Sequence, residues 1–327
     1  MTLKKDILTL FETNRGKALS GQQLADMLGV SRNSVWKVVK TLQQEGYKIV
    51  AAPNKGYLLD EANDILSPES IRANLDAKYK DKHITVLATT TSTNAEAMKM
   101  LQDGKIEHGT LIVSDEQTQG RGRMGKSFFS PKSGIYMSVC LCKSTKKLSD
   151  VMIITPAAAV AVRRAIAKYT DKDARIKWVN DVYIGKKKVC GILTQADIDF
   201  ESGSAGTFIV GIGVNFVNQQ FPDDIKDRAC ALFENNPTVT RSEMIAEIYS
   251  QLMELTDDIT DHSFMEEYKK YSLVTGNRIS YAINNEQKTG IVEDIDSDGG
   301  LIINEDGKRR TLTCGEISIK SADGSWI

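Results

Sequence analysis

The most constraining feature of the chain is a nine-residue stretch, Gln117–Gly125, in which three glycines are interleaved with two arginines. An apolar run, Gly109–Val113, precedes it and predicts a buried strand, whereas the stretch itself has neither a helical nor a strand period. Glycine lets the backbone approach a ligand closely, and guanidinium groups suit carboxylate or phosphate. The stretch therefore predicts an anion-binding loop. Taken alone, it equally suits a flexible basic hairpin without a ligand.

Length and composition indicate an ordinary globular chain of two or three domains, with 327 residues of which 41% are hydrophobic. No segment approaches the roughly 18 consecutive apolar residues of a membrane span, and the N-terminus begins an amphipathic helix rather than a signal peptide. Five scattered cysteines (Cys140, Cys142, Cys190, Cys230 and Cys314) match no metal or redox spacing. We therefore expect a cytoplasmic protein with reduced thiols and no membrane association.

The charge is unevenly distributed. The net charge of −1 argues against a globally basic coat for nucleic acid. Residues 1–60, however, hold nine Lys or Arg against five Asp or Glu, so this segment carries +4 and the rest of the chain −5. The asymmetry indicates a local anionic partner at the front of the chain.

The first sixty residues predict a helix-turn-helix. Ser20 and Ser31 are expected N-caps, and Gly29 and Gly46 are expected to end the helices that follow them. A short helix, a glycine-containing turn and a second helix form this motif. The three expected helices cover residues 3–14, 21–28 and 32–45. Two strands, 47–52 and 57–59, around a turn at 53–56 predict a wing.

Polar side chains gather on the outer face near the start of the third helix, and they are of types that reach base edges or phosphates. They are Ser31, Arg32, Asn33, Ser34, Lys37 and Lys40, with Lys55 on the wing tip. The alternative is an ordinary solvated helix face. One copy offers little contact area, so we expect a dimer on two half-sites.

Small hydroxyl side chains fill the junction between an expected strand, 83–88, and an expected helix, 95–102. Such groups at a helix start can hold the polar end of a ligand, or Ser92 or Thr93 is an ordinary N-cap. Downstream, Phe128 ends a loop that we expect to be disordered until it closes over a ligand. Its ring either stacks on an aromatic group or packs in the core.

Lys177 is unusual, because it alternates with apolar residues where a strand should be half buried. An inward lysine pairs with an anion or shifts its pKa. The lysines of 186–188, by contrast, are expected in a solvated turn. Gly211 and Gly213 share one strand face, which leaves that face flat for a ligand or another backbone.

The three histidines, His83, His108 and His262, have no nucleophile or metal-ligand spacing beside them. Electrostatic handling of a phosphate is the chemistry that the loops favour instead. Beyond a long helix, 241–259, capped by Thr240, and a helical segment, 264–271, the pattern changes. Five short alternating segments predict a small β-barrel: 277–283, 288–295, 300–304, 308–313 and 316–320.

Four motifs in order, Thr91–Asn94, Gln117–Arg123, Lys177–Asp181 and Gly211–Asn215, resemble those of the biotin–protein ligases. With the N-terminal helix-turn-helix, the chain resembles the bacterial bifunctional members, which also repress biotin synthesis genes. The resemblance implies an α+β multidomain fold. It comprises a winged helix-turn-helix (1–63), a central mixed α/β ligase domain (64–270) and a Src-homology-3-like barrel (271–327). Two positions depart from the family: Phe128 replaces the usual tryptophan and Val179 the usual proline.

The resemblance also implies a two-step reaction. Biotin and ATP with Mg²⁺ form biotinyl-5′-AMP, and a lysine of a biotin carboxyl carrier protein, of acetyl-CoA carboxylase or a similar carboxylase, then accepts the biotin. The adenylate would also be the corepressor that favours a homodimer on operator DNA. Two alternatives stay open: a ligand-sensing repressor without transfer activity, and a lipoate-type ligase.

The residue roles carried over from the family fall into three groups. The implied biotin contacts are Ser92, Thr93, Gln117, Gly120, Arg121, Lys177, Gly191 and Gly211. The implied ATP and adenylate contacts are Arg123, Phe128, Asn180, Gly213 and Asn215. Lys177, Arg123 and Arg121 are the expected catalytic groups, and Asn180 or Asp181 is the candidate Mg²⁺ ligand.

Overall fold

The structure is a computed structural model that describes residues 2–52, 55–145, 148–199, 204–217, 220–283, 286–313 and 317–319. Several positions named above lie outside the described residues: Pro53, Asn54, Cys314, Glu316 and Lys320. The chain divides into two compact units. The first comprises Met1–Asp81 and Val239–Ala246, and the second Lys82–Thr238 and Glu247–Ile327.

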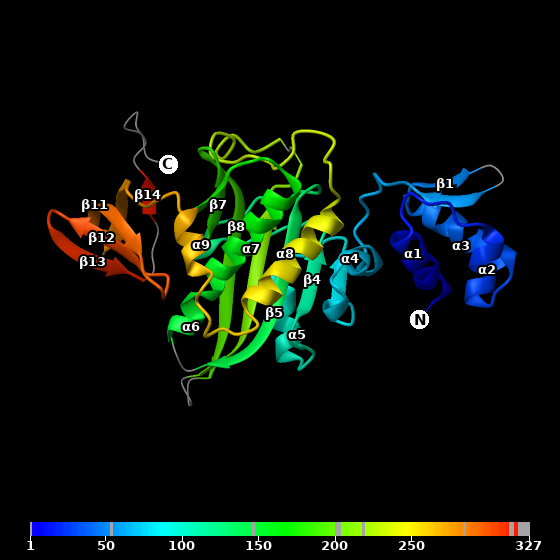
Figure 1. Ribbon diagram of the computed structural model, residues 1–327, viewed down its shortest axis with the longest axis horizontal. Coiled ribbons are helices and arrows are strands. Elements are labelled where there is room, and N and C mark those ends of the chain that lie inside the picture. Colours follow the sequence, from blue (N-terminus) through cyan, green and yellow to red (C-terminus); the bar gives the residue numbers. More distant parts are fainter. Residues whose placement is uncertain are drawn as a thin grey trace. The chain divides into compact units, whose positions relative to one another are not determined.

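The first unit confirms the helix-turn-helix and its two-stranded wing (Figure 1). Ser20 accepts a hydrogen bond from Gln23 N in a reciprocal capping box, and Gly29 ends that helix in the left-handed region with φ 63°. Ser31 likewise accepts from Ser34 N. The elements are α1 (Leu3–Thr13), α2 (Gly21–Leu28), α3 (Arg32–Gln44), β1 (Ile49–Ala52), β2 (Gly56–Leu59), α4 (Pro68–Asn74) and η1 (Ala77–Tyr79).

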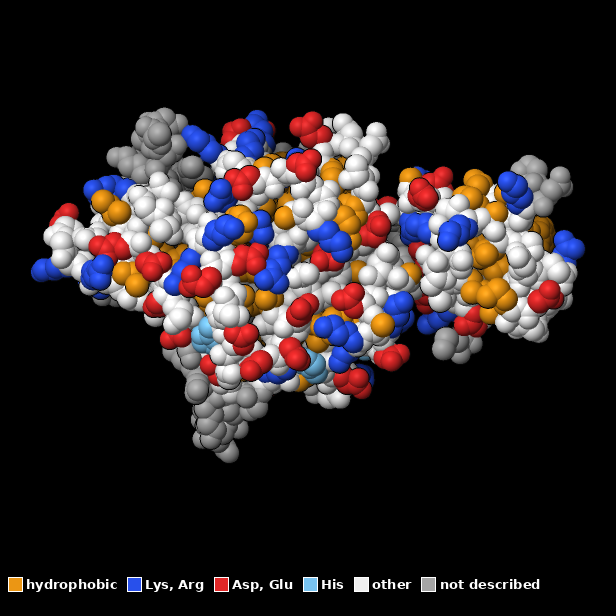
Figure 2. Space-filling view, in the orientation of Figure 1, with side chains coloured by type: hydrophobic (Ala, Val, Ile, Leu, Met, Phe, Trp, Pro, Cys, Tyr) orange, Lys and Arg blue, Asp and Glu red, His pale blue; other side chains and the backbone are white. Residues whose placement is uncertain are grey.

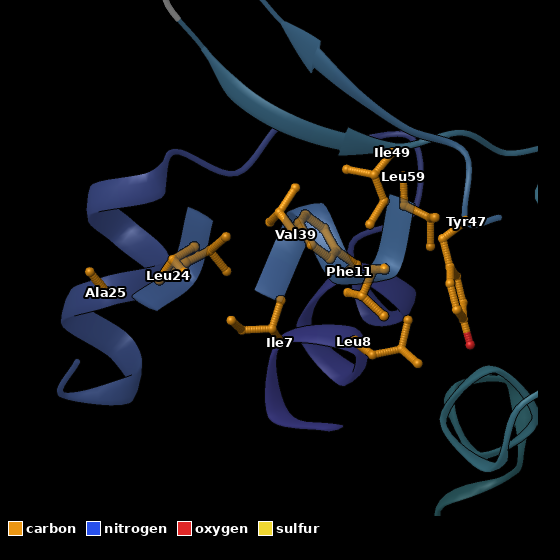
Figure 3. Close-up of a cluster of buried hydrophobic side chains, with 11 residues drawn as sticks. Ile7, Leu8, Phe11, Leu24, Ala25, Val39, Tyr47, Ile49 and Leu59 are labelled. Atoms are coloured by element: carbon orange, nitrogen blue, oxygen red, sulfur yellow. The ribbon is translucent and has the colours of Figure 1, made fainter. Parts of the chain in front are cut away.

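A single apolar core joins the three helices of this motif to its wing. Figure 3 shows Phe11 of α1 beside Val39 of α3, with Ile49 and Leu59 of the two wing strands close to them. All four side chains are buried. Because α1 and α3 present apolar residues at helical spacing to one interior, their polar faces are left to solvent.

The second unit is built on a mixed sheet. Within the described residues it has seven strands in the order β3-β4-β5-β9-β8-β7-β6, parallel between β3 and β4 and antiparallel elsewhere. The strands are β3 (Ile84–Leu87), β4 (Thr110–Ser114), β5 (Ile135–Thr145), β6 (Ala174–Lys177), β7 (Asp181–Ile184), β8 (Lys187–Asp199) and β9 (Ser204–Val214). The helical elements of this unit are α5 (Thr93–Gln102), η2 (Arg123–Gly125), α6 (Leu148–Met152), α7 (Ile154–Tyr169) and α9 (Met265–Lys270). A further helix, α8 (Arg241–Leu255), begins in the first unit and belongs to the second from Glu247 onward.

Helices cover the two faces of this sheet differently. On α7, Thr155 donates a hydrogen bond of 2.8 Å to Thr194 of β8, so α7 lies on the face to which Thr194 points. On the opposite face, α5 buries Ala97 against Ile112, Cys140 and Ile209. Side chains alternate between the two faces along each strand. The α5-side face of the sheet therefore continues beyond the N-terminal end of α5.

One sequence expectation is corrected here. The long helix expected to reach residue 259 ends at Leu255. The expected strand around Lys177 is β6, and a turn at 178–180 separates it from β7, with which it pairs.

The last five strands form an antiparallel sheet with the order β13-β12-β11-β10-β14. They are β10 (Arg278–Ile283), β11 (Glu286–Ile295), β12 (Leu301–Glu305), β13 (Lys308–Leu312) and β14 (Ile317–Ile319). Among the residues with described pairing, β13 and β14 are the two ends of this order, so the sheet is confirmed and a closed barrel is not. The Trp178 indole Nε1 donates to Gly299 O at 2.9 Å, which ties this sheet to the turn at 178–180.

The surface charge and the apolar character of the helices agree with what the composition indicated. Figure 2 shows acidic and basic side chains interspersed on the visible face of residues 82–327, with no single-sign coat there. Across the described helices, none combines the length and apolar character that crossing a membrane requires.

Candidate active site

A cavity of about 790 Å³ opens on the α5 side of the large sheet. Its volume lies within the range of small-molecule sites. Its lining includes most of the residues singled out from the sequence: Ser92, Thr93, Gln117, Arg121, Arg123, Phe128, Lys177, Asn180, Asp181, Gly191, Gly211, Gly213 and Asn215. Gly120 is not part of the lining. It is buried behind the wall, where an added Cβ would lie 2.4 Å from both Phe128 O and Ser130 Oγ.

One row of residues crosses the sheet beneath the cavity. The strand register aligns Lys177 of β6 with Asp181 of β7, Asp181 with Gly191 of β8, and Gly191 with Gly213 of β9. Residues aligned in this way point to the same face. A cation, an anion and two residues without side chains therefore form one continuous strip of the floor.

The hydroxyl cluster at the start of α5 is part of a buried hydrogen-bond network rather than a helix cap. Ser92 is at the N-cap position, but its side chain makes no capping hydrogen bond. Thr93 N donates to Gln117 Oε1 at 2.9 Å, and Thr93 Oγ1 lies 3.3 Å from the same oxygen. Gln117 Nε2 donates to Ser130 Oγ, 3.0 Å away. The ordinary-cap interpretation is therefore wrong for the Ser92 side chain.

The network continues through Ser138 of β5, which the sequence analysis did not single out. Ser138 Oγ lies 2.7 Å from both Thr93 Oγ1 and Asn94 Oδ1. Asn94 Nδ2 donates to Leu193 O at 3.1 Å and to Gln195 Oε1 at 2.9 Å. One hydroxyl proton cannot serve both of its neighbours, so Ser138 donates to Asn94 while accepting from Thr93, or donates to Thr93, which then donates to Gln117.

The glycine–arginine loop folds back on itself. Gly122 N donates to Lys126 O at 2.7 Å and Phe128 N donates to Gly120 O at 2.8 Å. Met124, at the tip, has φ 53° and is 75% exposed. The loop is thus a hydrogen-bonded hairpin here, and its expected disorder and closure over a ligand stay predictions.

Arg123 and Lys177, two of the expected catalytic groups, line the same cavity. Arg123 Nη1 donates to Asn180 Oδ1 at 3.3 Å, and Asn180 Nδ2 donates to Ile192 O at 2.9 Å. Lys177 is half buried with its Nζ 5.3 Å from the centre of the Tyr183 ring. Burial, with Asp181 nearby, raises the pKa of Tyr183 well above its ordinary value, so its phenol is neutral.

Lys188 corrects the expectation of a solvated basic turn. Only Gly185 and Lys186 are exposed there, whereas Lys188 lines the cavity and its Nζ lies 2.7 Å from Asp181 Oδ1. The ammonium also lies 5.8 Å from the centre of the Phe128 ring. In the sequence, Lys188 lies only three residues before Gly191, which was the available signal. Strict alternation along a strand, however, would have placed Lys187 on the same face as Gly191.

Phe128 covers the glycine part of the floor. A Cβ added at Gly213 would lie 2.6 Å from the Phe128 ring, and one added at Gly191 would lie 3.1 Å from it. At Gly211 the side chain of Asn94 takes the space, 2.3 Å from such a Cβ. The flat face expected from the glycines is therefore occupied by two side chains, and Phe128 packs on the sheet with its ring half buried.

Comparison with known proteins identifies the family. The model of the Biotin/lipoate A/B protein ligase family matches residues 86–215, an HTH domain matches 4–58, and the Biotin protein ligase C terminal domain matches 276–320. The Bifunctional ligase/repressor BirA of Bacillus subtilis (strain 168) is 34% identical over 310 residues, covering 92% of this chain and 94% of that protein. This chain belongs to the biotin–protein ligases.

Other relatives agree on the family. The Bifunctional ligase/repressor BirA of Escherichia coli (strain K12) is 26% identical over 313 residues, covering 94% of the ligase described here and 95% of that protein. The solved Biotin protein ligase from Aquifex aeolicus in complex with biotin and ATP is 27% identical. It superimposes with a TM-score of 0.62, covering 74% of this ligase and 100% of that chain.

The candidate Mg²⁺ ligands of the ligase are both engaged by cations. Asn180 Oδ1 accepts from Arg123, and Asp181 is paired with Lys188. In the described part of the chain, no group of three or more His, Cys, Asp or Glu side chains could hold a metal ion. This arrangement does not fit a metal ion held by the protein alone.

The candidate DNA-binding residues of the ligase gather at the front of α3. Arg32, Asn33, Lys37 and Lys40 are exposed, as is Lys55 beside the wing turn. Ser31 is committed to the helix cap, and its Oγ lies 2.9 Å from Ser34 Oγ. The two serine hydroxyls therefore bond to each other and to the helix, which leaves the longer polar side chains to reach a partner.

Proposed function

We propose that this ligase joins biotin to a lysine of a biotin carboxyl carrier protein by way of biotinyl-5′-AMP made from ATP, and that it represses transcription through its helix-turn-helix. One observation supports the ligase activity most directly. The described lining of a single cavity includes six cationic side chains, next to a hydrogen-bonding floor at Thr93 and Gln117: Arg121, Arg123, Lys126, Lys177, Lys188 and Arg228. Such a site suits a small polar ring system at one end and a phosphate at the other.

In the first step, the carboxylate of biotin attacks the α-phosphate and pyrophosphate leaves. Negative charge grows on the phosphate oxygens in the transition state, so fixed cations beside them lower the barrier. Lys188 and Lys177 approach the floor from two strands, and Arg123 reaches it from the loop. Ser92, Thr93 and Gln117, with Arg121, are the proposed ring contacts. The absence of a side chain at three positions leaves room for the backbone and side chains around the biotin: Gly191, Gly211 and Gly120.

The nucleotide is proposed to occupy the part of the cavity around Phe128, Gly213, Asn180 and Asn215. Movement of the Phe128 ring off the glycine floor would open a flat surface for an adenine ring, on which Phe128 could then stack. Mg²⁺ enters the proposal as a companion of the ATP phosphates, which bind this ion with few protein ligands.

In the second step, the lysine amine of the carrier protein attacks the acyl carbonyl of the adenylate and AMP leaves. The groups that stabilised the phosphate now stabilise the departing one, so no covalent enzyme intermediate is needed. Closure of the Gln117–Gly125 loop would shield the labile anhydride from water until the carrier docks.

The repressor part of the proposal is a homodimer that binds operator DNA of biotin genes when the adenylate is bound. The contacts proposed are Arg32, Asn33, Lys37, Lys40 and Lys55, with Ser31 and Ser34 at the helix start. Domain boundaries at residues 63 and 270, a Src-homology-3-like barrel at the C-terminus and a cytoplasmic location complete the proposal.

The test is a transfer assay with the full chain, ATP, biotin and an apo carrier domain. We expect biotin on the carrier lysine and pyrophosphate release that requires biotin. Pyrophosphate release without carrier modification would contradict transfer and leave a ligand-sensing repressor. Modification by lipoate in preference to equimolar biotin would instead identify a lipoate-type ligase.

A further inference from the structure

The outer face of α3 holds a large apolar side chain among its cations. Trp36 is 48% exposed, whereas its neighbours along the chain on the other face of the helix, Val35 and Val39, are buried. Burying an indole contributes on the order of 2 kcal/mol or more to folding, since aromatic side chains bury the largest areas. Trp36 gives up much of that contribution at a surface position where any polar residue would suit the helix.

Along α3, the charged residues around Trp36 all have the same sign. Arg32 and Lys40 are one helical turn before and after it, and residues four apart share a helix face. Asn33 and Lys37 flank it. Throughout Arg32–Gln44 there is no Asp or Glu, so this face has cations, an amide and one aromatic ring. A single exposed apolar residue is common. An aromatic ring with a cation one helical turn before it and another one turn after it, however, favours an anionic partner that also has apolar groups.

Duplex DNA in its major groove has that composition. Phosphates line the groove edges, and thymine places a C5-methyl group in the groove where apolar side chains contact it. Residues near the N-terminal end of a recognition helix are the ones that reach base edges, and Trp36 is the fifth residue of α3. The two serines before it are engaged in the helix cap, which leaves Trp36 among the few side chains able to read a base.

We propose that Trp36 is a base-reading residue, whose ring contacts a thymine methyl group while Arg32, Lys37 and Lys40 hold the flanking phosphates. The inference rests on the proposed repressor function and adds a sequence preference to it. Loss of the ring should remove discrimination at one thymine per half-site and leave the sequence-independent electrostatic binding in place.

The experiment uses the full chain with biotin and ATP. Wild-type protein first selects duplexes from a randomised pool. Each thymine of the selected duplex is then replaced in turn by uracil, which lacks only the methyl group. We expect one position per half-site at which wild type loses affinity. Trp36→Ala should bind the selected duplex roughly tenfold to a hundredfold more weakly and should be indifferent to uracil at that position. The affinity for a random duplex should stay roughly unchanged, within about twofold of wild type.

Matched controls separate the possible failures. Ile291→Ala removes another exposed apolar side chain, 44% exposed and in the second unit, and should leave every DNA measurement unchanged. Carrier biotinylation by Trp36→Ala should equal that of wild type, which shows that the ligase part is intact. If wild type selects no duplex, the repressor function itself fails. If Trp36→Ala keeps wild-type affinity or wild-type sensitivity to uracil, the repressor function stands and this inference is overturned.

Discussion

Lys188 Nζ lies 2.7 Å from Asp181 Oδ1 on the floor of the cavity. The pair joins neighbouring strands, β8 and β7, directly beside Gly191. A carboxylate placed there holds the ammonium in position but also balances its charge. An incoming phosphate or carboxylate would therefore compete with Asp181 for Lys188, and the strength of that competition sets how much Lys188 contributes to the reaction.

Lys188→Met should strongly slow adenylate formation. The substitution keeps most of the side-chain stem and removes the charge, so we expect biotin-dependent pyrophosphate release to fall about 10²–10³-fold, as when one oxyanion-stabilising donor is removed. Lys186→Met, in the exposed turn, should have the wild-type rate. Because an unpaired Asp181 could itself disturb the site, Lys188→Met combined with Asp181→Asn is also measured. Recovery of activity in that double variant would contradict a direct role for Lys188.

Lys177→Ala should raise the barrier of the same step by ~2.7–4 kcal/mol, the effect of deleting a donor to a developing charge. The comparison is Arg175→Ala, which changes another half-buried cation two residues earlier in β6 but outside the cavity lining. Rates of adenylation are measured by pyrophosphate release at saturating biotin. Wild-type adenylation by Lys177→Ala would exclude the proposed role, whatever its effect on transfer.

Gly213→Ala should weaken ATP binding more than biotin binding. The new methyl group would stand on the glycine floor, 2.6 Å from the present position of the Phe128 ring, and would occupy the flat surface that we assign to the adenine ring. Gly206→Ala in the same strand is the control, because nothing lies within 4 Å of its added Cβ. Calorimetric titration with biotin, and then with ATP, separates the two affinities. Equal ATP affinity in both variants would place the nucleotide elsewhere.

Ser138→Ala should weaken biotin binding, although Ser138 is not one of the proposed biotin contacts. The change removes both 2.7 Å hydrogen bonds of the hydroxyl, and a buried acceptor left unsatisfied costs about 1–3 kcal/mol. We expect biotin affinity to fall about tenfold, equivalent to ~1.4 kcal/mol, with the KM for ATP little changed. Thr194→Val removes a hydrogen bond from the opposite face of the sheet and should lower Tm without affecting biotin. An identical biotin affinity in the two variants would assign Ser138 a purely structural part.

Stability should fall as the pH drops toward 5, with a contribution from His108. Burial, followed by the charges of Lys143 and Lys82, lowers the pKa of His108 from its ordinary 6.5, and its Nδ1 accepts a hydrogen bond from Cys142 N. The unfolded chain therefore binds a proton as pH falls through 6.5, whereas the folded chain does so only at lower pH. The stabilisation is present above the unfolded pKa and is lost between the two values.

Thermal unfolding of wild type and His108→Gln between about pH 8 and about pH 5 checks this effect. Glutamine can accept the same hydrogen bond but does not titrate, so the Tm of the variant should fall less steeply over that range. Parallel curves would show that His108 does not contribute.

Residues close together in the sequence were sufficient to predict the N-terminal local structure, and the motifs named most of the residues that line the cavity. The caps at Ser20 and Ser31 and the stop at Gly29 depend on hydrogen bonds and dihedral angles within a few residues, so the helix-turn-helix could be read in order along the chain. The ordered set of motifs likewise indicated which loops belong to one cavity. Lys177 and Arg123 were expected to meet there, and they line the same space.

Tertiary structure decided which lysine of the basic run faces the cavity. Side chains alternate along a strand, so Gly191 and Lys187 would share a face in a regular β8. The register between β7 and β8 shifts between Val182 and Tyr183, and such an irregularity reverses the alternation beyond it. Lys188 is therefore turned onto the floor beside Asp181. Ser138 was equally hidden, because its partners Thr93 and Asn94 on α5 are adjacent to it only once that helix has packed on the sheet.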